Sequence, residues 1–444
     1  MIHSDSTPAA PVQPLLPPAV PEAFDINLTA QVIERLALHA RTLPDIFRVH
    51  SPQRDRDDFV VIRPDLVKRV LLDNRHGYGK GAAFSRVKLL LGNSIIASDG
   101  DVWHRNRLMI QPAFHKQAVE DHARRLIDLN REVAQRWADQ ADAGHPIDVT
   151  AATSELALHD VLLALFSEDL RRFEDDKGHN PLWMVNEHSE RNLRFALEFR
   201  QLATPVRELL RWRRQHGVQR DDIVGIIMRS TDRQTGQPMA ERQLVDEILM
   251  LIVAGHETTA SALNFCWYLL SRHPKVQADL HAEVERVIGD RDPTIEDLGR
   301  LQYCRQVLEE SMRLYPPGWA FSRKALADDS LGGYHVPKGT ELLVTPYLTH
   351  RHPGWWREPE RFDPTRFEPG ARAARDRFAF LPFSAGPRRC IGDGLAMLEM
   401  QLHLAMVVPR VGFRAPADRA SIEVEAEINL RSRQPIVLSA FRRP

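Results

Sequence analysis

The spacing of apolar residues along the chain predicts a mostly helical protein. Apolar residues recur every three or four positions, which is the period of one face of an α-helix. The segments that show this pattern are 30–41, 116–141, 153–166, 192–215, 241–271, 274–289, 303–314 and 392–411. Because these segments dominate the chain, we expect a fold that is mostly α.

Strand patterns are few and short. Residues 59–62 read Phe-Val-Val-Ile and residues 435–438 read Pro-Ile-Val-Leu, and both are typical of strands. Residues 334–336 and 341–344 flank a Pro-Lys-Gly turn, and we predict that they pair as a hairpin across it. The stretch 355–376 is rich in Pro, Arg and Glu, which predicts an ordered but irregular loop. The β portion of the fold is therefore minor.

The chain reads as one folded unit after a short lead-in. Residues 1–25 are rich in proline and predict an extended segment, whereas residues 26–444 contain no repeat and no linker and predict a single domain. No run of about 18 apolar residues is present. A charged segment followed by an apolar one, the mark of a signal peptide, is also absent. We expect a cytoplasmic protein without a membrane anchor.

Charge and cysteine content exclude several classes of function. The 59 basic and 60 acidic residues give a net charge of -1, which provides no bias toward nucleic acid or anionic membrane. The three cysteines, Cys266, Cys304 and Cys390, form no CxxC pair, which argues against a disulfide scaffold and a zinc ribbon. Cys266 and Cys304 lie in apolar helical segments and are expected to be small buried side chains.

Cys390 lies in a loop whose residue types suit a bound cofactor. Residues 383–392 read Phe-Ser-Ala-Gly-Pro-Arg-Arg-Cys-Ile-Gly and precede an apolar helix. Gly386 permits backbone angles that other residues avoid. Arg388 is a permanent cation that can pair with an acidic cofactor group. Cys390 stands near a helix N-terminus, which lowers a thiol pKa, and Gly392 lets a flat ligand approach the backbone. A cysteine in a Gly-Pro turn is usually only a buried side chain, but five such positions in ten residues favour a ligand.

This loop resembles the haem-binding signature of the cytochrome P-450 family, Phe-x-x-Gly-x-Arg-x-Cys-x-Gly, with every defined position filled. The resemblance implies a triangular, helix-rich single domain with small β-sheets. It also implies a haem b cofactor whose iron takes Cys390 as its axial thiolate ligand. Arg388 would then contact a haem propionate, while Phe383, Gly386 and Gly392 would shape the loop beneath the haem.

A second motif resembles the family's structural triad. Glu310 and Arg313 stand three residues apart on one predicted helix, where they can pair. Taken alone, such a pair is often a surface salt bridge of little consequence. The segment 359–362, Pro-Glu-Arg-Phe, resembles the part of the family that supplies a third member. By this resemblance Glu310, Arg313 and Arg361 form a triad that stabilises the fold.

Further basic positions resemble the residues that hold the haem propionates. Trp103 and Arg107 lie four residues apart, hence on one helix face, after an acidic or serine cap. From the residues alone, this is also the start of an amphipathic helix. The pair resembles the family's Trp-x-x-x-Arg helix, which contacts the propionates. Arg323 resembles a further arginine with that role, since arginine pairs bidentately with carboxylates.

The segment 250–261 contains unusual residues for an apolar helix. It reads Met-Leu-Ile-Val-Ala-Gly-His-Glu-Thr-Thr-Ala-Ser, and a mid-helix glycine costs about 1 kcal/mol relative to alanine. One explanation is a helix kink with threonine hydroxyls bonded to their own backbone. The segment also resembles the family's oxygen-activation motif. By that resemblance Ala254 and Gly255 leave room for O2 over the iron, while Thr258 and Glu257 are catalytic and deliver protons. His256 fills the variable position.

These resemblances span roughly residues 45–440 and imply a haem-thiolate monooxygenase. Such an enzyme uses O2 and two electrons from a separate ferredoxin or flavodoxin, with its reductase, to oxidise a lipophilic small molecule such as a terpenoid, fatty acid or polyketide-like metabolite. A peroxide-using peroxygenase, a haem isomerase and a non-catalytic haem sensor remain alternatives, but these usually lack the Glu257–Thr258 pair. The expected pocket wall includes Phe84, Leu251, Ala254, Ala320 and Phe321.

Overall fold

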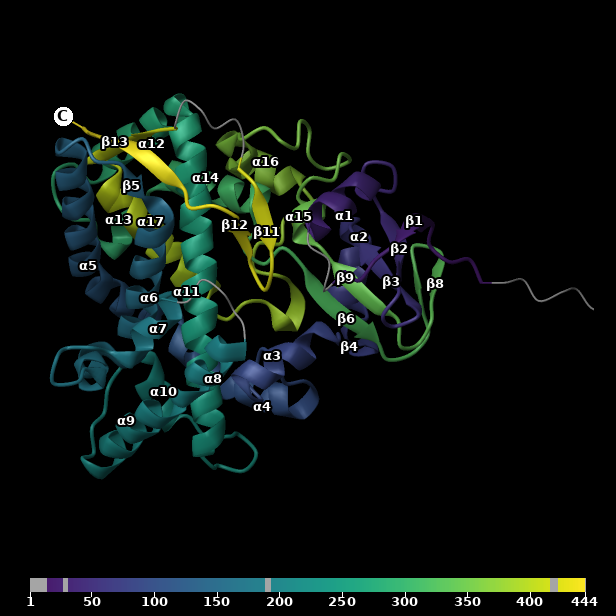
Figure 1. Ribbon diagram of the computed structural model, residues 1–444, viewed down its shortest axis with the longest axis horizontal. Helices are drawn as coiled ribbons and strands as arrows, with labels where there is room; N and C mark the ends of the chain where they lie inside the picture. Colours follow the sequence, from purple (N-terminus) through teal and green to yellow (C-terminus); the bar gives the residue numbers. More distant parts are fainter. Residues whose placement is uncertain (1–13, 27–30, 188–192, 416–421, 444) are drawn as a thin grey trace, which may run out of the picture.

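The computed structural model describes residues 14–26, 31–187, 193–415 and 422–443. Figure 1 shows helices filling one side of the molecule and a small sheet at the other. The predicted fold class, mostly α with a minor β portion, is therefore confirmed.

The helices include every segment that was predicted from periodicity. They are α1 (Val32–Ala40), α2 (Pro64–Lys68), α3 (Ala83–Leu91), α4 (Gly100–Ile110), α5 (Lys116–Asp142), α6 (Val149–Phe166), α7 (Met184–Glu187), α8 (Leu193–Gln201), α9 (Ala203–Gln215), α10 (Ile223–Arg229), α11 (Glu241–Arg272), α12 (Pro274–Val287), α13 (Ile295–Leu298), α14 (Gln302–Leu314), α15 (Pro346–Thr349), α16 (Pro369–Ala374) and α17 (Asp393–Val407). The segment predicted as one helix over 192–215 is two helices, α8 and α9, which meet at Leu202.

The strands form one larger sheet and three small ones. They are β1 (Ala19–Ala23), β2 (Ile46–Ser51), β3 (Arg56–Val61), β4 (Tyr78–Lys80), β5 (Ile147–Asp148), β6 (Phe321–Ala325), β7 (Asp329–Leu331), β8 (Tyr334–Val336), β9 (Glu341–Val344), β10 (Val411–Arg414), β11 (Val424–Ala426), β12 (Leu430–Ser432) and β13 (Val437–Arg442). The six-stranded sheet has the order β1-β2-β3-β9-β6-β4.

The predicted hairpin between residues 334–336 and 341–344 is wrong. Strand β8 pairs with β7, while β9 joins the larger sheet between β3 and β6. The β7–β8 turn contains Gly332 and Gly333, both with positive φ (63° and 88°), as a tight two-residue hairpin turn requires. The Pro-Lys-Gly segment instead carries the chain from one sheet to the other.

Part of the predicted lead-in belongs to the sheet. Strand β1 pairs in parallel with β2, and Val20 and Phe24 beside it are buried in an apolar cluster with β2 and α1. The boundary that was predicted at residue 25 therefore lies inside the folded unit, because apolar side chains of residues 20–24 complete its core. Residues 1–13 of the predicted lead-in lie outside the described residues.

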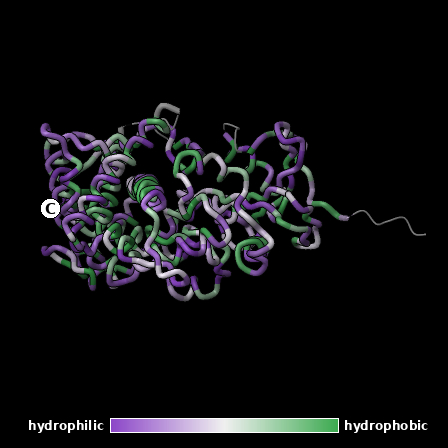
Figure 2. Tube along the Cα trace, turned by 90° about the horizontal axis from the view of Figure 1, so that it is seen from below, coloured by the Kyte–Doolittle hydropathy of each residue, from purple (hydrophilic) through white to green (hydrophobic). Residues whose placement is uncertain are grey.

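Helix α11 is the centre of the helical part. Its first half packs in an apolar cluster with α6, α9 and α10, and its second half packs in another with α5, α14 and α17. Figure 2 shows hydrophobic and hydrophilic residues alternating along the helical trace, as expected where each helix has one buried face. Helix α11 and the segment Val149–Phe173 are long and apolar enough to cross a membrane, but 78% and 61% of their apolar windows are buried inside the protein.

Three aromatic side chains fix the helices that carry the candidate site. Trp137 of α5 and Trp267 of α11 pack edge to face, with ring centroids 5.7 Å apart. The Trp267 indole N–H donates to Nε2 of His403 on α17 at 3.1 Å, and His403 contacts Asn130 of α5 at 3.1 Å. All these groups are buried, so α17 is held firmly against α11.

Candidate active site

The Cys390 loop is held in place by its own backbone and by a neighbouring segment. It lies between a short 3-10 helix, Gly386–Arg388, and α17, and the N–H of Cys390 donates to the carbonyl of Phe383 at 2.9 Å. Gly386 has φ 72°, and a Cβ there would come within 2.2 Å of the Leu71 carbonyl oxygen. The prediction that Gly386 is needed for backbone reasons agrees with this geometry.

The environment of the Cys390 thiol differs from the prediction. Desolvation by the surrounding protein raises the pKa of the thiol, although the Gly392 N–H, Arg107 and Arg389 act in the opposite direction. The predicted lowering by the helix N-terminus is therefore outweighed by desolvation. A thiol with a raised pKa is protonated at neutral pH unless a metal ion takes the proton's place.

Gly392 is not required by protein packing. Its φ is -95°, which any residue can adopt, and an added Cβ would make only ordinary contact with Phe114 at 3.7 Å. The packing around Gly392 therefore leaves room for a small side chain. Phe383 is half-buried and packs against the cluster around α17.

Cations gather near the cysteine loop with few carboxylates to balance them. Arg388 pairs with Asp99, the N-cap of α4, and its guanidinium lies 5.6 Å from the ring centroid of Trp103. Nη1 of Arg388 has no hydrogen-bond partner among the described residues. Arg107 of α4 donates to the carbonyl of Arg389 at 3.0 Å. The structure thus brings Trp103, Arg107 and Arg388 together, as predicted from the sequence.

Arg323 and Lys80 extend this group. They are partners in the β4–β6 ladder, and Arg323 is buried with one side-chain hydrogen bond, 2.9 Å to the carbonyl of Ser322. Burial and the charge of Arg388 lower the pKa of Arg323 to about 10 and that of Lys80 to about 7. In the part of the chain that the structure describes, neither side chain forms an ion pair. Nζ of Lys80 donates to the carbonyls of Ile95 and Ile96, at 2.7 and 2.5 Å, whereas Arg323 is a buried cation with one backbone acceptor. Such a buried cation calls for an anionic ligand.

The α11 residues do not all have the predicted roles. The Thr258 hydroxyl donates to the Ala254 carbonyl at 2.7 Å, so its proton is held by the helix and its oxygen lone pairs remain. Oε2 of Glu257 accepts a hydrogen bond from Asn429 at 2.9 Å. A Cβ at Gly255 would come within 2.6 Å of Val161 on α6. Gly255 therefore allows the close packing of α11 on α6, and its expected role in leaving room for O2 stays a prediction.

The structural cluster contains Arg366 in place of Arg361. Nε and Nη2 of Arg313 donate to the two carboxylate oxygens of Glu310 at 2.7 and 2.9 Å, and both side chains are fully buried. Arg366 lies 3.4 Å from Glu310. The Arg361 side chain instead points to Glu358 at the surface, and only its carbonyl accepts from Arg313, at 3.1 Å. The prediction for Arg361 is therefore wrong as to the side chain, because a motif cannot show which nearby arginine the loop turns inward.

The predicted pocket residues come from different elements. Leu251 is buried on α11, and Ala320 and Phe321 are half-buried at the start of β6. Phe84 on α3 lies under the Lys80 ammonium, 5.1 Å from ring centroid to Nζ. Their role as pocket wall stays a prediction.

The chain matches the family model for Cytochrome P450 over residues 13–214 and 179–430. The chain belongs to the cytochrome P450 family. It is 33% identical over 368 residues to cyclooctat-9-en-7-ol 5-monooxygenase of Streptomyces melanosporofaciens, covering 79% of each chain. It is 30% identical to pentalenene oxygenase of Streptomyces avermitilis, covering 87% of this chain and 86% of that protein. The protein is therefore a cytochrome P450 monooxygenase, as the sequence motifs predicted.

A solved structure agrees in fold. The crystal structure of the cytochrome P450DA heme domain matches with a TM-score of 0.86, covering 97% of this chain and 98% of that one at 24% sequence identity. This likeness confirms the P450 fold across almost the whole chain.

The residues of this P450 fit a haem. An iron ion can accept the Cys390 thiolate, and the two propionates of haem would supply an anionic partner for Arg323 and an acceptor for the unpartnered Nη1 of Arg388. Gly392, which has no side chain, would let a flat ring approach the backbone beside Cys390. The cofactor is therefore haem.

Three residues of this P450 were missed by the sequence analysis. Lys80 has no motif around it, and only its pairing with Arg323 across β4 and β6 shows that it lies near the predicted site. Asn429 lies 172 residues from Glu257, its hydrogen-bond partner. Arg366 follows the predicted segment 359–362 by a few positions, and a search for every arginine near that segment could have found it.

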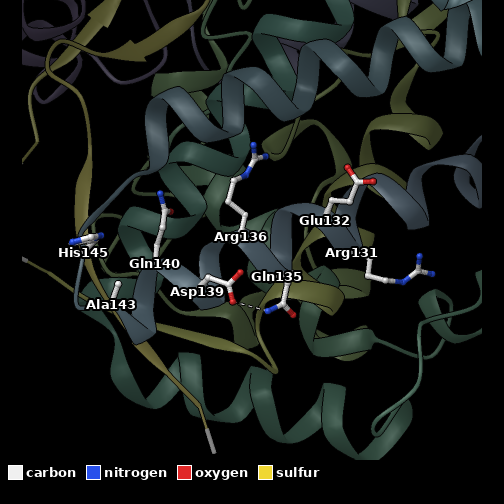
Figure 3. Close-up of a pocket in the computed structure, with 8 residues that line it drawn as sticks. All are labelled: Arg131, Glu132, Gln135, Arg136, Asp139, Gln140, Ala143 and His145. Atoms are coloured by element: carbon white, nitrogen blue, oxygen red, sulfur yellow. Dashed lines mark hydrogen bonds between the residues drawn. The ribbon is translucent and has the colours of Figure 1, made fainter.

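A groove of about 670 Å³ lies elsewhere on this P450, along α5. Figure 3 shows its lining residues, Arg131, Glu132, Gln135, Arg136, Asp139, Gln140, Ala143 and His145. They carry mixed charges, nearly all are exposed, and Gln135 donates to Asp139 at 2.7 Å. None belongs to the predicted site, and the groove is a surface hollow between solvated side chains.

Proposed function

We propose that this P450 binds haem b with Cys390 as the axial thiolate ligand. In this proposal O2 and electrons from a separate ferredoxin or flavodoxin, with its reductase, oxidise a lipophilic small molecule. The observation that carries the proposal is that the Cys390 loop leads into α17, which packs on α11, the helix with Glu257 and Thr258. Leu395 of α17 lies in the same apolar cluster as the first half of α11. A thiolate ligand and a proton-delivering pair are thus held in one rigid frame.

The chain's own residues divide the work around the cofactor. Arg388, Arg107, Trp103 and Arg323, together with Lys80, would hold the propionates. Phe383, Gly386 and Gly392 would shape the loop beneath the ring, and Ala254 would border the opposite face. The haem supplies the oxidative chemistry when bound, and the protein supplies its ligand, protons and substrate orientation. Glu257 would pass protons from solvent, and the Thr258 oxygen would accept and hand on a hydrogen bond.

The substrate we propose is a cyclic terpenoid. Two relatives are named for cyclooctat-9-en-7-ol and pentalenene, which are cyclic terpenoids. The residues expected to wall the pocket, Phe84, Leu251, Ala254, Ala320 and Phe321, are apolar and suit such a ligand. We further propose a cytoplasmic location, because the two long apolar helices among the described residues are core helices of the fold.

The ligand assignment is tested by optical spectroscopy of the haem-loaded protein. The reduced carbon monoxide adduct should give the absorption maximum that is characteristic of thiolate ligation, and Cys390→Ser should lose it while Cys304→Ser keeps it. An imidazole-type spectrum of the wild-type protein would refute Cys390 as the ligand.

The substrate class is tested by binding. A library of lipophilic compounds, including cyclic terpenes, fatty acids and macrolides, is titrated into the ferric protein while the shift from low to high spin is followed. Cyclic terpenes should give the strongest shifts. If fatty acids alone shift the spectrum, the proposed class is wrong.

A further inference from the structure

The hairpin of β11 and β12 lies along one face of α11. Glu257, Ser261 and Asn264 are spaced by four and three residues, which places them on that face. The Ser261 hydroxyl donates to the Leu430 carbonyl at 2.5 Å, and Asn264 donates to the Ser432 hydroxyl at 3.2 Å. The hairpin therefore follows α11 closely from residue 429 to residue 432.

The same hairpin is fixed from its other side. The Trp319 indole donates to the Glu427 carbonyl at 2.9 Å, and the Leu430 N–H donates to the Pro317 carbonyl at 2.9 Å. Leu430 is fully buried in an apolar cluster that also contains Trp319. Residues 427–430 are thus held between α11 and the segment that enters β6, so Asn429 has a defined position relative to Glu257.

Asn429 contacts the acid of the oxygen-activation motif. Its side-chain amide donates to Oε2 of Glu257 at 2.9 Å, and both residues are only partly buried. A hydrogen bond from an amide fixes the direction of a carboxylate and brings no full charge of its own. Arg431, two residues further on, pairs with Glu425 and Glu427 of the hairpin, both at 3.0 Å. Asn429 therefore offers Glu257 a neutral donor on a rigid support.

We propose that Asn429 is a positioning residue for Glu257 and sets the direction from which that carboxylate delivers protons. The proposal rests on the proposed role of Glu257 in O2 activation. It also gives the β11–β12 hairpin a second task besides packing. Ala320 and Phe321, which belong to the expected pocket wall, directly follow Trp319, the residue that holds the hairpin at Glu427. A ligand that moves this wall would therefore also move the donor to Glu257.

The first test measures how O2 is reduced in the haem-loaded, substrate-free enzyme with NADPH, a surrogate ferredoxin and its reductase. Two electrons and two protons convert O2 to hydrogen peroxide, whereas four of each convert it to two waters. A misplaced Glu257 would deliver fewer protons to the reduction of O2 to water. Asn429→Ala should therefore raise peroxide formed per NADPH by about twofold or more. Asn429→Asp should raise it at least as far, because a second carboxylate repels Glu257.

A matched control separates positioning from hairpin packing. Ser261→Ala removes another bond between the same helix and the same hairpin but does not touch Glu257. Its peroxide yield should remain that of the wild type. In the background Glu257→Gln, Asn429→Ala should add nothing further, because both changes act through one carboxylate. Full additivity, or an equal effect of Ser261→Ala, would refute the proposal.

The second test needs neither turnover nor substrate. Thermal unfolding is compared for wild type, Asn429→Ala, Glu257→Ala and the double variant. We expect Asn429→Ala to lower the midpoint by about 2 °C in the wild-type background and by less in the Glu257→Ala background. Equal shifts in both backgrounds would show that the two side chains do not interact. If this cycle shows coupling but the wild type consumes no NADPH, the contact stands and the proposed O2 chemistry fails instead.

Discussion

Two buried arginines of this P450, Arg313 in the structural cluster and Arg323 near the Cys390 loop, differ in how completely the protein satisfies them. In the structural cluster Arg313 donates to both Glu310 oxygens and to the carbonyls of His350, Pro359 and Arg361. In the site cluster Arg323 has a single backbone acceptor, and Arg388 keeps a nitrogen without a partner among the described residues. Arg313 is satisfied by protein groups alone and stabilises the fold, whereas Arg323 has no carboxylate partner among the described residues and suits an anionic ligand.

The largest expected effect comes from the structural cluster around Glu310 and Arg313. Arg313→Ala leaves the buried Glu310 carboxylate without its main partner and should lower the free energy of unfolding by about 3–5 kcal/mol. Denaturant unfolding followed by circular dichroism measures this loss. Arg313→Lys keeps the charge without the bidentate geometry, so its free energy of unfolding should lie between those of the wild type and Arg313→Ala. A loss below about 1 kcal/mol would show that this cluster is not the structural one.

Removing a cation near the Cys390 loop is expected to stabilise the haem-free protein instead of destabilising it. Arg323→Met should stabilise the haem-free protein by about 1 kcal/mol, because it removes a buried cation without a carboxylate partner. The same change should weaken haem retention about tenfold, measured by transfer to apomyoglobin, since one propionate contact is lost. If Arg323→Met destabilises the haem-free protein as Arg313→Ala does, the distinction between the two clusters is broken.

Lys80 allows the same comparison by pH. Burial lowers the pKa of Lys80 to about 7, whereas in the unfolded chain it lies near 10.5. Between these two values the unfolded state binds the extra proton, so the stability of the haem-free protein should rise with pH. Lys80→Met should flatten this part of the pH profile. A wild-type profile that is already flat between pH 7 and 10 would contradict the assignment.

A buried pair of carboxyl groups extends the comparison of buried charges to acidic side chains. Asp160 on α6 and Glu399 on α17 are both buried, and burial raises the pKa of both carboxyls, with the charge of Asp160 raising that of Glu399 further. The stability that such acids contribute is fully present below their unfolded pKa and is lost as pH rises above it toward their raised folded pKa. Asp160→Asn should therefore add about 1–2 kcal/mol at pH 7 and nothing below about pH 4. A gain that is equal at both pH values would rule out this cause.

The smallest expected effect separates the two arginines near Glu310. Arg366→Ala should cost about 1 kcal/mol, because it removes an ion pair to a buried carboxylate. Arg361→Ala should cost less than about 0.5 kcal/mol, because its side chain pairs at the surface with Glu358. Matched thermal unfolding of the two variants measures the difference, and equal costs would restore Arg361 as a member of the cluster.

Local sequence predicted those features that local sequence determines. The defined positions of the Cys390 loop lie within ten residues, and Trp103 and Arg107 lie four residues apart on α4. Within each of these two motifs, the spacing along the chain determines the geometry. The partners of β8, Lys80 and Asn429 depend on segments far along the chain, and no local pattern contains that information. Arg366 illustrates the same limit at short range, because a loop decides which arginine faces inward.

The three faces of α11 differ in how freely they can change over evolutionary time. Gly255 is confined by α6, and Glu257 and Ser261 are joined to the β11–β12 hairpin. The remaining stripe contains Leu251, Ala254 and Thr258, spaced by three and four residues. Leu251 and Ala254 are therefore the positions on this helix where a substitution would leave both the tight contact of Gly255 and the hairpin bonds of Glu257 and Ser261 in place.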